Sequence, residues 1–171
     1  VNDAGEEDAL VRSMQSGRTG MLSVSVANDF GYMHLCRVLG DFMVQYPDGS
    51  VNLELDNRNI EMISEGYDAA IRVGEMEDSS LRARKIAETT IRMVASPGYL
   101  QRAGRPRRIE DLGAHKLLHY TNQANGAVWK MTSQTGEKRQ IRTTGSFTVN
   151  DGQSLLNAAI NGLGIAYLPS F

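Results

Sequence analysis

The chain has 171 residues, 18 of them basic and 20 acidic, so its formal net charge at pH 7 is −2. A nearly neutral chain offers no global positive field to hold nucleic acid phosphates or an anionic membrane. No apolar run approaches the roughly 20 residues of a membrane helix, and the acidic start differs from a signal peptide. We therefore expect a cytoplasmic protein that does not bind DNA through its overall charge.

The first half of the chain alternates strand and helix patterns. Leu10, Val11 and Met14 have helical spacing, which predicts the end of a helix that enters from elsewhere. A loop is expected at 27–31, followed by an apolar helical stripe that stops at Pro47. The predicted elements are a strand at 22–26, a helix at 35–46, a strand at 51–55, a short helix ending at Gly66 and a strand at 69–73. This order indicates a mainly parallel sheet with right-handed crossovers.

The second half has shorter strand candidates and more antiparallel character. Ser96 is placed to cap a helix that has Pro97 at its first position and ends at Gly104. Asn150 or Asp151 caps a later helix. The strand candidates are 91–94, 116–120, 128–131, 138–142, 147–149 and 163–168. We predict two unequal α/β lobes with a boundary near 88–91.

Catalytic and metal motifs are missing from the sequence. His115 and His119 are four residues apart but fall on a predicted strand without a third ligand, so core or surface histidines are expected. Cys36 is the only cysteine, which excludes an intrachain disulfide, and a buried thiol is expected. The arginines at 102–108 favour a solvated loop over a phosphate patch. We predict no catalytic residues, no metal site and no cofactor.

Polar residues collect where predicted strands give way to helices. They are Asn28 and Asp29, Asn57 and Arg58, Arg72, and Asn150 and Asp151. In open α/β sheets, ligands bind beyond the carboxyl ends of the strands. The alternative interpretation is that Asn28, Asp56, Asn57 and Asp151 only cap helices and that the arginines pair with surface carboxylates. The two interpretations are compatible, since a capping residue can also line a binding site.

Five segments of the chain resemble one known family. GMLSVSVANDFG, FMVQYPDGSVNLEL, EGYDAAIRVG, MVASPGYLQRAGRPRRIEDLGAHKLL and VNDGQSLLNAAINGLGIAYLP occur in collinear order over about residues 20–169. Together they are similar to the effector-binding domain of LysR-type transcriptional regulators.

The resemblance implies a periplasmic-binding-protein-like fold with two Rossmann-like lobes, crossover strands and a ligand cleft between the lobes. It assigns 1–19 to the end of a linker helix, 20–90 to lobe I, 91–168 to lobe II and 169–171 to the start of a return crossover. Relatives continue beyond this point to complete lobe I, so the chain resembles a shortened domain. The DNA-binding domain of such regulators precedes the linker helix.

The resemblance also implies ligand contacts, which fall on the junctions already found from the residues. Asn28 stands where many relatives have a hydroxyl residue. The resemblance adds the crossover near Ala95 and Ser96. The resulting ligand-binding candidates are Asn28, Asp29, Phe30, Asn57, Arg58, Arg72, Ser96, Asn150 and Asp151.

The expected function is to sense a small organic effector, an organic acid or an aromatic compound, without catalysing a reaction. The ligand would shift the equilibrium between lobe orientations. Expected partners are other copies of the chain in a homodimer or homotetramer, with DNA and RNA polymerase contacted only through the full-length protein and no membrane. Two alternatives are a solute-binding protein of a transport system and an enzyme that uses His34 and Asp29 as an acid–base pair.

Overall fold

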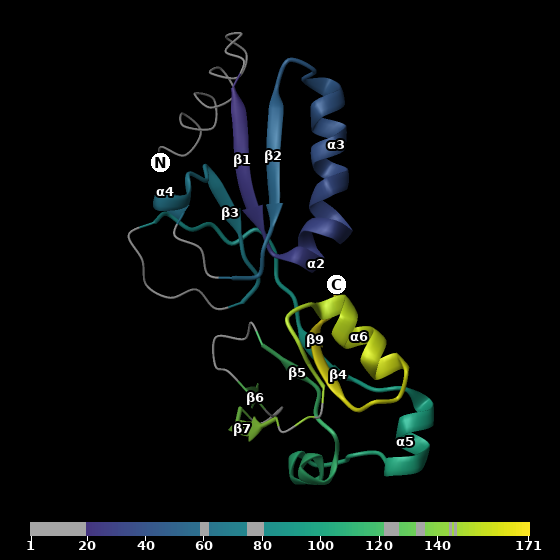
Figure 1. Ribbon diagram of the computed structural model, residues 1–171. Coiled ribbons are helices and arrows are strands. Elements are labelled where there is room, and N and C mark those ends of the chain that lie inside the picture. The colour runs from purple at the N-terminus through teal and green to yellow at the C-terminus, as the bar shows by residue number, and fades with distance from the viewer. Residues whose placement is uncertain are drawn as a thin grey trace. The chain divides into compact units, whose positions relative to one another are not determined.

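The computed structural model describes residues 20–58, 62–74, 81–121, 127–132, 136–143, 145 and 147–171. Contacts divide the chain into unit 1, Val1–Val73, and unit 2, Gly74–Phe171. The helix predicted near the start lies outside the described residues. No helix in the described ranges is long and apolar enough to cross a membrane. The structure confirms the α/β class, with separate helices and sheets in each unit (Figure 1).

Unit 1 is built on a three-stranded parallel sheet, as the sequence predicts. Strand β1 (Met21–Val26) lies between β2 (Ser50–Leu55) and β3 (Ala69–Ile71) (Figure 1). Val26 is in register with both Leu55 and Ile71, so the three strands end at one edge. The short helix α4 (Met62–Glu65) precedes β3, and Gly66 follows it with φ of +77°, the left-handed conformation predicted there.

The helix after β1 starts earlier than predicted. Helix α2 (Asn28–Phe30), the π-helical turn η1 (Gly31–Leu35) and α3 (Cys36–Gln45) follow one another without a break. The predicted loop at 27–31 is therefore wrong. Gly31 permits the helical start, because a Cβ at this position would lie only 2.6 Å from Val26 Cγ1. The lack of a side chain lets the first turn approach the sheet closely.

The expected burial of Cys36 is also wrong, because its side chain is exposed. Leu35, Leu39 and Phe42 form the half-buried face of the helix. Successive residues on an α-helix are about 100° apart, so Cys36 turns away from the side that Leu35 faces. The sequence pattern located the apolar stripe correctly, but not the cysteine relative to it.

Unit 2 contains both parallel and antiparallel pairs. Strand β4 (Ile91–Val94) is antiparallel to β9 (Ala166–Pro169), β5 (His119–Tyr120) is parallel to β8 (Thr148–Val149), and β6 (Val128–Thr132) is antiparallel to β7 (Lys138–Arg142). A parallel bridge between Leu117 and Ile165 connects the β5 and β9 segments. The helices are α5 (Pro97–Ala103), the 3₁₀ turn η2 (Ile109–Ala114) and α6 (Gly152–Ile160).

The core of unit 2 consists of two hydrophobic clusters. One packs around Trp129, which is 1% exposed, together with Tyr99, Leu112, Leu117, Met131 and Ile165. The other joins α6 to the strands through Leu118, Leu155, Ala158, Ala159 and Ala166. Full burial of side chains of this size stabilises a fold by about 1.5–3 kcal/mol each, before entropy losses. These clusters hold the ends of β5 and β8 in place.

Candidate functional site

The carboxyl ends of the three strands in unit 1 bring several predicted site residues together. The Ala27 N–H donates to the Ile71 carbonyl at 3.0 Å, and the Asp56 N–H donates to the Val26 carbonyl at 2.9 Å. These bonds extend the sheet by one residue on each side of β1. Asn28, Asn57 and Arg72 consequently follow neighbouring strand ends.

Asn28 and Asn57 are joined directly. The backbone N–H of Asn28 donates to Asn57 Oδ1 at 2.8 Å. The side-chain oxygen of Asn28 is buried and receives no hydrogen bond within the described protein. The capping interpretation is wrong for Asn28, because Ala27 is the N-cap of α2 and no side chain caps it. Asn28 is instead the first helical residue, and its Oδ1 is an acceptor without a donor.

Arg72 reaches back from the end of β3 over the sheet. Its Nη2 donates to Ser25 Oγ at 2.8 Å and its Nη1 donates to the Ile71 carbonyl at 3.1 Å. Ser25 is fully buried and Arg72 is half-buried. Burial lowers the pKa of the guanidinium, and the nearby Asp56 carboxylate partly opposes this effect. Both hydrogen-bond partners of Arg72 are uncharged.

Arg58 is committed to a local ion pair. Its Nε donates to Asp56 Oδ2 at 2.6 Å, and its backbone N–H donates to Asp56 Oδ1 at 2.8 Å. These two bonds lower the pKa of Asp56. The Arg58 side chain is 68% exposed, whereas that of Asp56 is 13% exposed. Asp56 is therefore an acceptor for Arg58, which is the surface pairing anticipated from the sequence.

The first turns of the helix after β1 carry the remaining predicted residues of unit 1. Asp29 and Phe30 are half-buried. The rings of Phe30 and His34 lie 5.3 Å apart and are tilted by 50°. His34 therefore has a ring contact with Phe30 one turn earlier in the helix.

In unit 2, the structure separates Ser96 from Asn150 and Asp151. Strands β5, β8 and the segment at Ile165 run in parallel, whereas β4 runs against β9. The carboxyl end of β4 therefore lies at the edge opposite to the one that Asn150 and Asp151 occupy. Ser96 Oγ accepts from the Tyr99 N–H at 3.2 Å, and Asp151 Oδ1 accepts from the Ser154 N–H at 2.7 Å. Both residues cap helices, as predicted.

Two polar residues at these edges were not selected from the sequence. Ser25 accepts a hydrogen bond from Arg72. The sequence signal for Ser25 is its alternation with apolar residues in β1, which it shares with Ser23. Thr121 follows β5 beside Asn150, and its N–H donates to the Val149 carbonyl at 3.0 Å. Its position directly after a predicted strand is the sequence signal for this residue.

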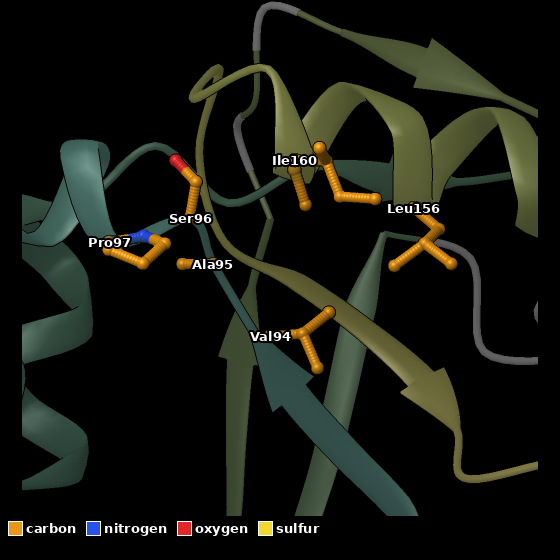
Figure 2. A pocket seen from close by; sticks show the side chains of 7 residues that line it. Val94, Ala95, Ser96, Pro97, Leu156 and Ile160 are labelled. Atoms are coloured by element: carbon orange, nitrogen blue, oxygen red, sulfur yellow. The ribbon is translucent and has the colours of Figure 1, made fainter.

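An apolar pocket lies at the carboxyl end of β4 (Figure 2). Figure 2 shows Val94 from β4 and Leu156 and Ile160 from α6 around it, and its lining is completed by Ala95, Ser96, Pro97 and Ala159. The hydroxyl of Ser96 already accepts the capping bond. A ligand site generally combines an apolar surface with a few polar groups that fix orientation. The strand ends of unit 1 match this description better than the pocket does.

Comparison with known proteins decides the family. A model of the LysR substrate binding domain matches residues 15–171. The chain belongs to this family. A transcriptional regulator of the helix-turn-helix type from Haemophilus influenzae is 39% identical over 169 residues, 99% of this chain and 58% of that protein. The regulator CrgA from Neisseria meningitidis serogroup B is 32% identical over 152 residues, 89% of this chain and 50% of that protein.

Solved structures of LysR-type regulators have the same fold. The structure of CrgA matches with a TM-score of 0.79 at 27% identity, covering 98% of this chain and 56% of that chain. Full-length AphB, a virulence activator of Vibrio cholerae, matches with a TM-score of 0.78 at 28% identity and the same coverage. The chain thus spans little more than half the length of these regulators. The relatives are transcriptional regulators, so the comparison supports a regulator rather than a solute-binding transport protein.

Proposed function

We propose that this LysR-family chain is the effector-sensing part of a longer transcriptional regulator. It binds a small organic molecule without converting it, and the binding alters how a DNA-binding domain elsewhere in the regulator acts. The observation that carries this proposal is the family match over residues 15–171, because the matched family is a substrate-binding domain. A ligand shifts such a conformational equilibrium only if it binds one state more tightly than the other.

The proposed ligand contacts are the polar residues at the strand ends. In unit 1 they are Asn28, Asp29, Phe30, Asn57, Arg58 and Arg72, and Arg72 is supported most strongly because its partners are uncharged. In unit 2 they are Asn150 and Asp151, joined by Thr121. Ser96 is the weakest member, because its strand end lies at the other edge. In this proposal, lobe I comprises residues 20–90 and lobe II comprises residues 91–168.

Self-association is the second part of the proposed function. The helix after β1 exposes Tyr32, Met33, Val38 and Val44, with Val44 85% exposed. Four exposed apolar side chains of this size on one helical segment support a surface that another copy of the chain covers, as in a dimer or tetramer. Sedimentation equilibrium of the full-length regulator measures this directly. A monomer at micromolar concentration would overturn the assignment.

Thermal unfolding of the full-length regulator with a library of small acids, phenols, amines and neutral aromatics tests effector binding. A ligand that binds only the folded state stabilises it by about 2.7 kcal/mol at 100 times its Kd. We expect at least one compound to raise Tm and to change the affinity of the regulator for its operator DNA. The compound should be recovered chemically unchanged.

Two outcomes would contradict this function. If no compound in the library raises Tm, effector binding is not supported. If a bound compound is converted and the conversion disappears in His34→Ala, the chain is an enzyme instead. A matched exposed variant such as Arg37→Gln controls for general effects of substitution on Tm.

A further inference from the structure

Arg72 has hydrogen-bonding capacity that the described protein does not use. A guanidinium carries five N–H donors and remains charged at neutral pH. Two of the donors reach Ser25 Oγ and the Ile71 carbonyl, and no ion pair joins Arg72 to a carboxylate in the described ranges. The remaining three donors can bind a planar anion such as a carboxylate through two parallel bonds.

The nearby Asp56 carboxylate forms no ion pair with the Arg72 guanidinium in the described ranges. Asp56 directs both of its oxygens to Arg58, through bonds of 2.6 and 2.8 Å. Asp29, in the adjoining first turn of α2, also has an interaction partner within the protein. A half-buried cation whose contacts are a hydroxyl and a carbonyl favours an anionic ligand over a cationic one.

At the same strand ends, Asn28 adds a hydrogen-bond acceptor that has no donor among the described residues. Its Oδ1 is buried and lacks a donor within the described protein. A buried acceptor without a donor is unfavourable, and a ligand that donates a hydrogen bond removes the penalty. The Ile71 carbonyl accepts from both Arg72 Nη1 and the Ala27 N–H. Arg72 therefore binds the same carbonyl as the residue that precedes Asn28, so both residues belong to the carboxyl ends of β1 and β3.

We propose that the effector is a small organic anion that also carries a hydrogen-bond donor, such as a hydroxy or amino carboxylate. Arg72 binds its acidic group, and Asn28 Oδ1 accepts a hydrogen bond from its hydroxyl or amino group. This inference rests on the proposed function and narrows the ligand class that unit 1 selects. It assigns the selectivity for an acidic group to Arg72 and the selectivity for a hydrogen-bond donor to Asn28. Substitution of one residue should therefore leave the other selectivity intact.

The test uses two matched trios of probes with the full-length regulator. One trio is 4-hydroxybenzoate, benzoate and 4-hydroxybenzamide, and the other is lactate, propionate and lactamide. Within each trio, the first compound has charge and donor, the second lacks the donor and the third lacks the charge. Affinities are obtained from Tm shifts and isothermal titration. In at least one trio, we expect the hydroxy acid to bind about tenfold or more tightly than both of its analogues.

Two variants separate the two contacts. Arg72→Gln should abolish the preference for the acid over the amide while preserving the preference for the hydroxyl. Asn28→Leu should abolish the preference for the hydroxyl while preserving the preference for the acid. Asn28→Leu should leave Tm of the ligand-free protein unchanged or raised, because the oxygen that it removes has no partner. Arg37→Gln, an exposed arginine on α3, should preserve both preferences.

Several outcomes would overturn the inference while leaving the proposed function intact. Examples are tighter binding of a neutral or cationic library compound than of any acid, equal binding within both trios, or preferences that persist in both variants. A fall in the Tm of the ligand-free protein on Asn28→Leu would show that Asn28 is structural and would also overturn its assignment. Absence of binding by every compound in the broad library would instead refute the proposed function itself.

Discussion

Unit 1 and unit 2 both pack helices near small sheets, yet α6 buries four of its nine residues whereas α3 buries none. The buried positions of α6 are Gly152, Leu155, Ala158 and Ala159, and they meet strands on the inner side of the helix. The inner face of α3 is only half-buried, and its outer face carries exposed apolar side chains. Unit 2 is therefore stabilised mainly by its own core.

Unit 1 has a different balance. Its fully buried side chains include Val26 and Ser25, and Ser25 is a polar residue that holds Arg72. The strand ends carry an acceptor without a donor and a cation without a carboxylate contact, features that reduce stability and favour a ligand. The difference suggests that unit 1 is the part of the chain whose stability responds most to binding.

The largest expected effect is in the core of unit 2. Trp129→Ala should lower the free energy of unfolding by about 3–5 kcal/mol, because the substitution empties the centre of a closed cluster. Trp129 is 1% exposed and its ring lies 5.2 Å from that of Tyr167. Urea unfolding followed by circular dichroism measures the loss, since the variant has no tryptophan to report fluorescence.

Val44→Ala on α3 is the matched control for Trp129→Ala. In a single chain Val44 is 85% exposed, and substitutions at such positions usually change stability by less than about 0.5 kcal/mol. The two variants are therefore compared at a concentration below that at which copies associate. Similar losses from the two variants would break the comparison between the units. Such a result would also show that the outer face of α3 is covered in solution.

Three glycine substitutions should have graded effects. In Gly164→Ala the new Cβ would lie 2.2 Å from the Lys116 carbonyl oxygen, and a backbone atom in a paired segment cannot move aside easily. We expect a loss of about 1–3 kcal/mol or more. Gly31→Ala meets the Val26 side chain at 2.6 Å, which can shift, so its loss should be smaller. Gly40→Ala has nothing within 4 Å and should stabilise the helix by about 0.5–1 kcal/mol.

Urea midpoints of the three glycine variants check this order. A larger loss from Gly31→Ala than from Gly164→Ala would mean that unit 1 is packed more rigidly than its exposure indicates. A destabilising Gly40→Ala would show that another surface covers α3 at that point.

The smallest effects concern two aspartates with lowered pKa values. Arg58 lowers the pKa of Asp56 mainly through its side chain, whereas the backbone N–H groups of Arg107 and Arg108 lower that of Asp111. A lowered folded-state pKa contributes stability above the unfolded value, and this is lost as pH falls below about 4. The stability differences of Asp56→Asn and Asp111→Asn from the unsubstituted protein should therefore shrink with acid.

Salt distinguishes these two aspartates. At pH 7, 1 M NaCl should reduce the effect of Asp56→Asn, because an exposed ion pair is screened. It should change the effect of Asp111→Asn little, since neutral N–H donors hold that carboxylate. Unfolding by urea at pH 3–7, with and without salt, measures both. Equal salt sensitivity would contradict the distinction between an ion pair at Asp56 and backbone N–H donors at Asp111.

Local sequence signals predicted most of the regular structure. Strand alternation located β1 and β2, Pro97 and Gly104 marked the limits of α5, and Asp151 marked the start of α6. The helix start at Asn28 was missed because it depends on how Gly31 fits against Val26 and Leu55. The exposure of Cys36 was missed because Cys36 lies to one side of the half-buried face that Leu35 shares with Leu39. Ligand binding by the predicted site residues remains a prediction. The structure shows that Asn28, Asn57 and Arg72 follow neighbouring strand ends in unit 1.

By itself, the sequence determined the α/β class and the polar residues that follow the strands, because periodicity and capping chemistry act over a few neighbouring residues. The resemblance to the family came from five collinear segments. Tertiary structure decided how those residues are used. Only the parallel register of β1 and β3 brings Ser25 under Arg72, and only the antiparallel pairing of β4 and β9 carries Ser96 away from Asp151. Strand pairing joins residues far apart in the chain, so no local pattern can specify it.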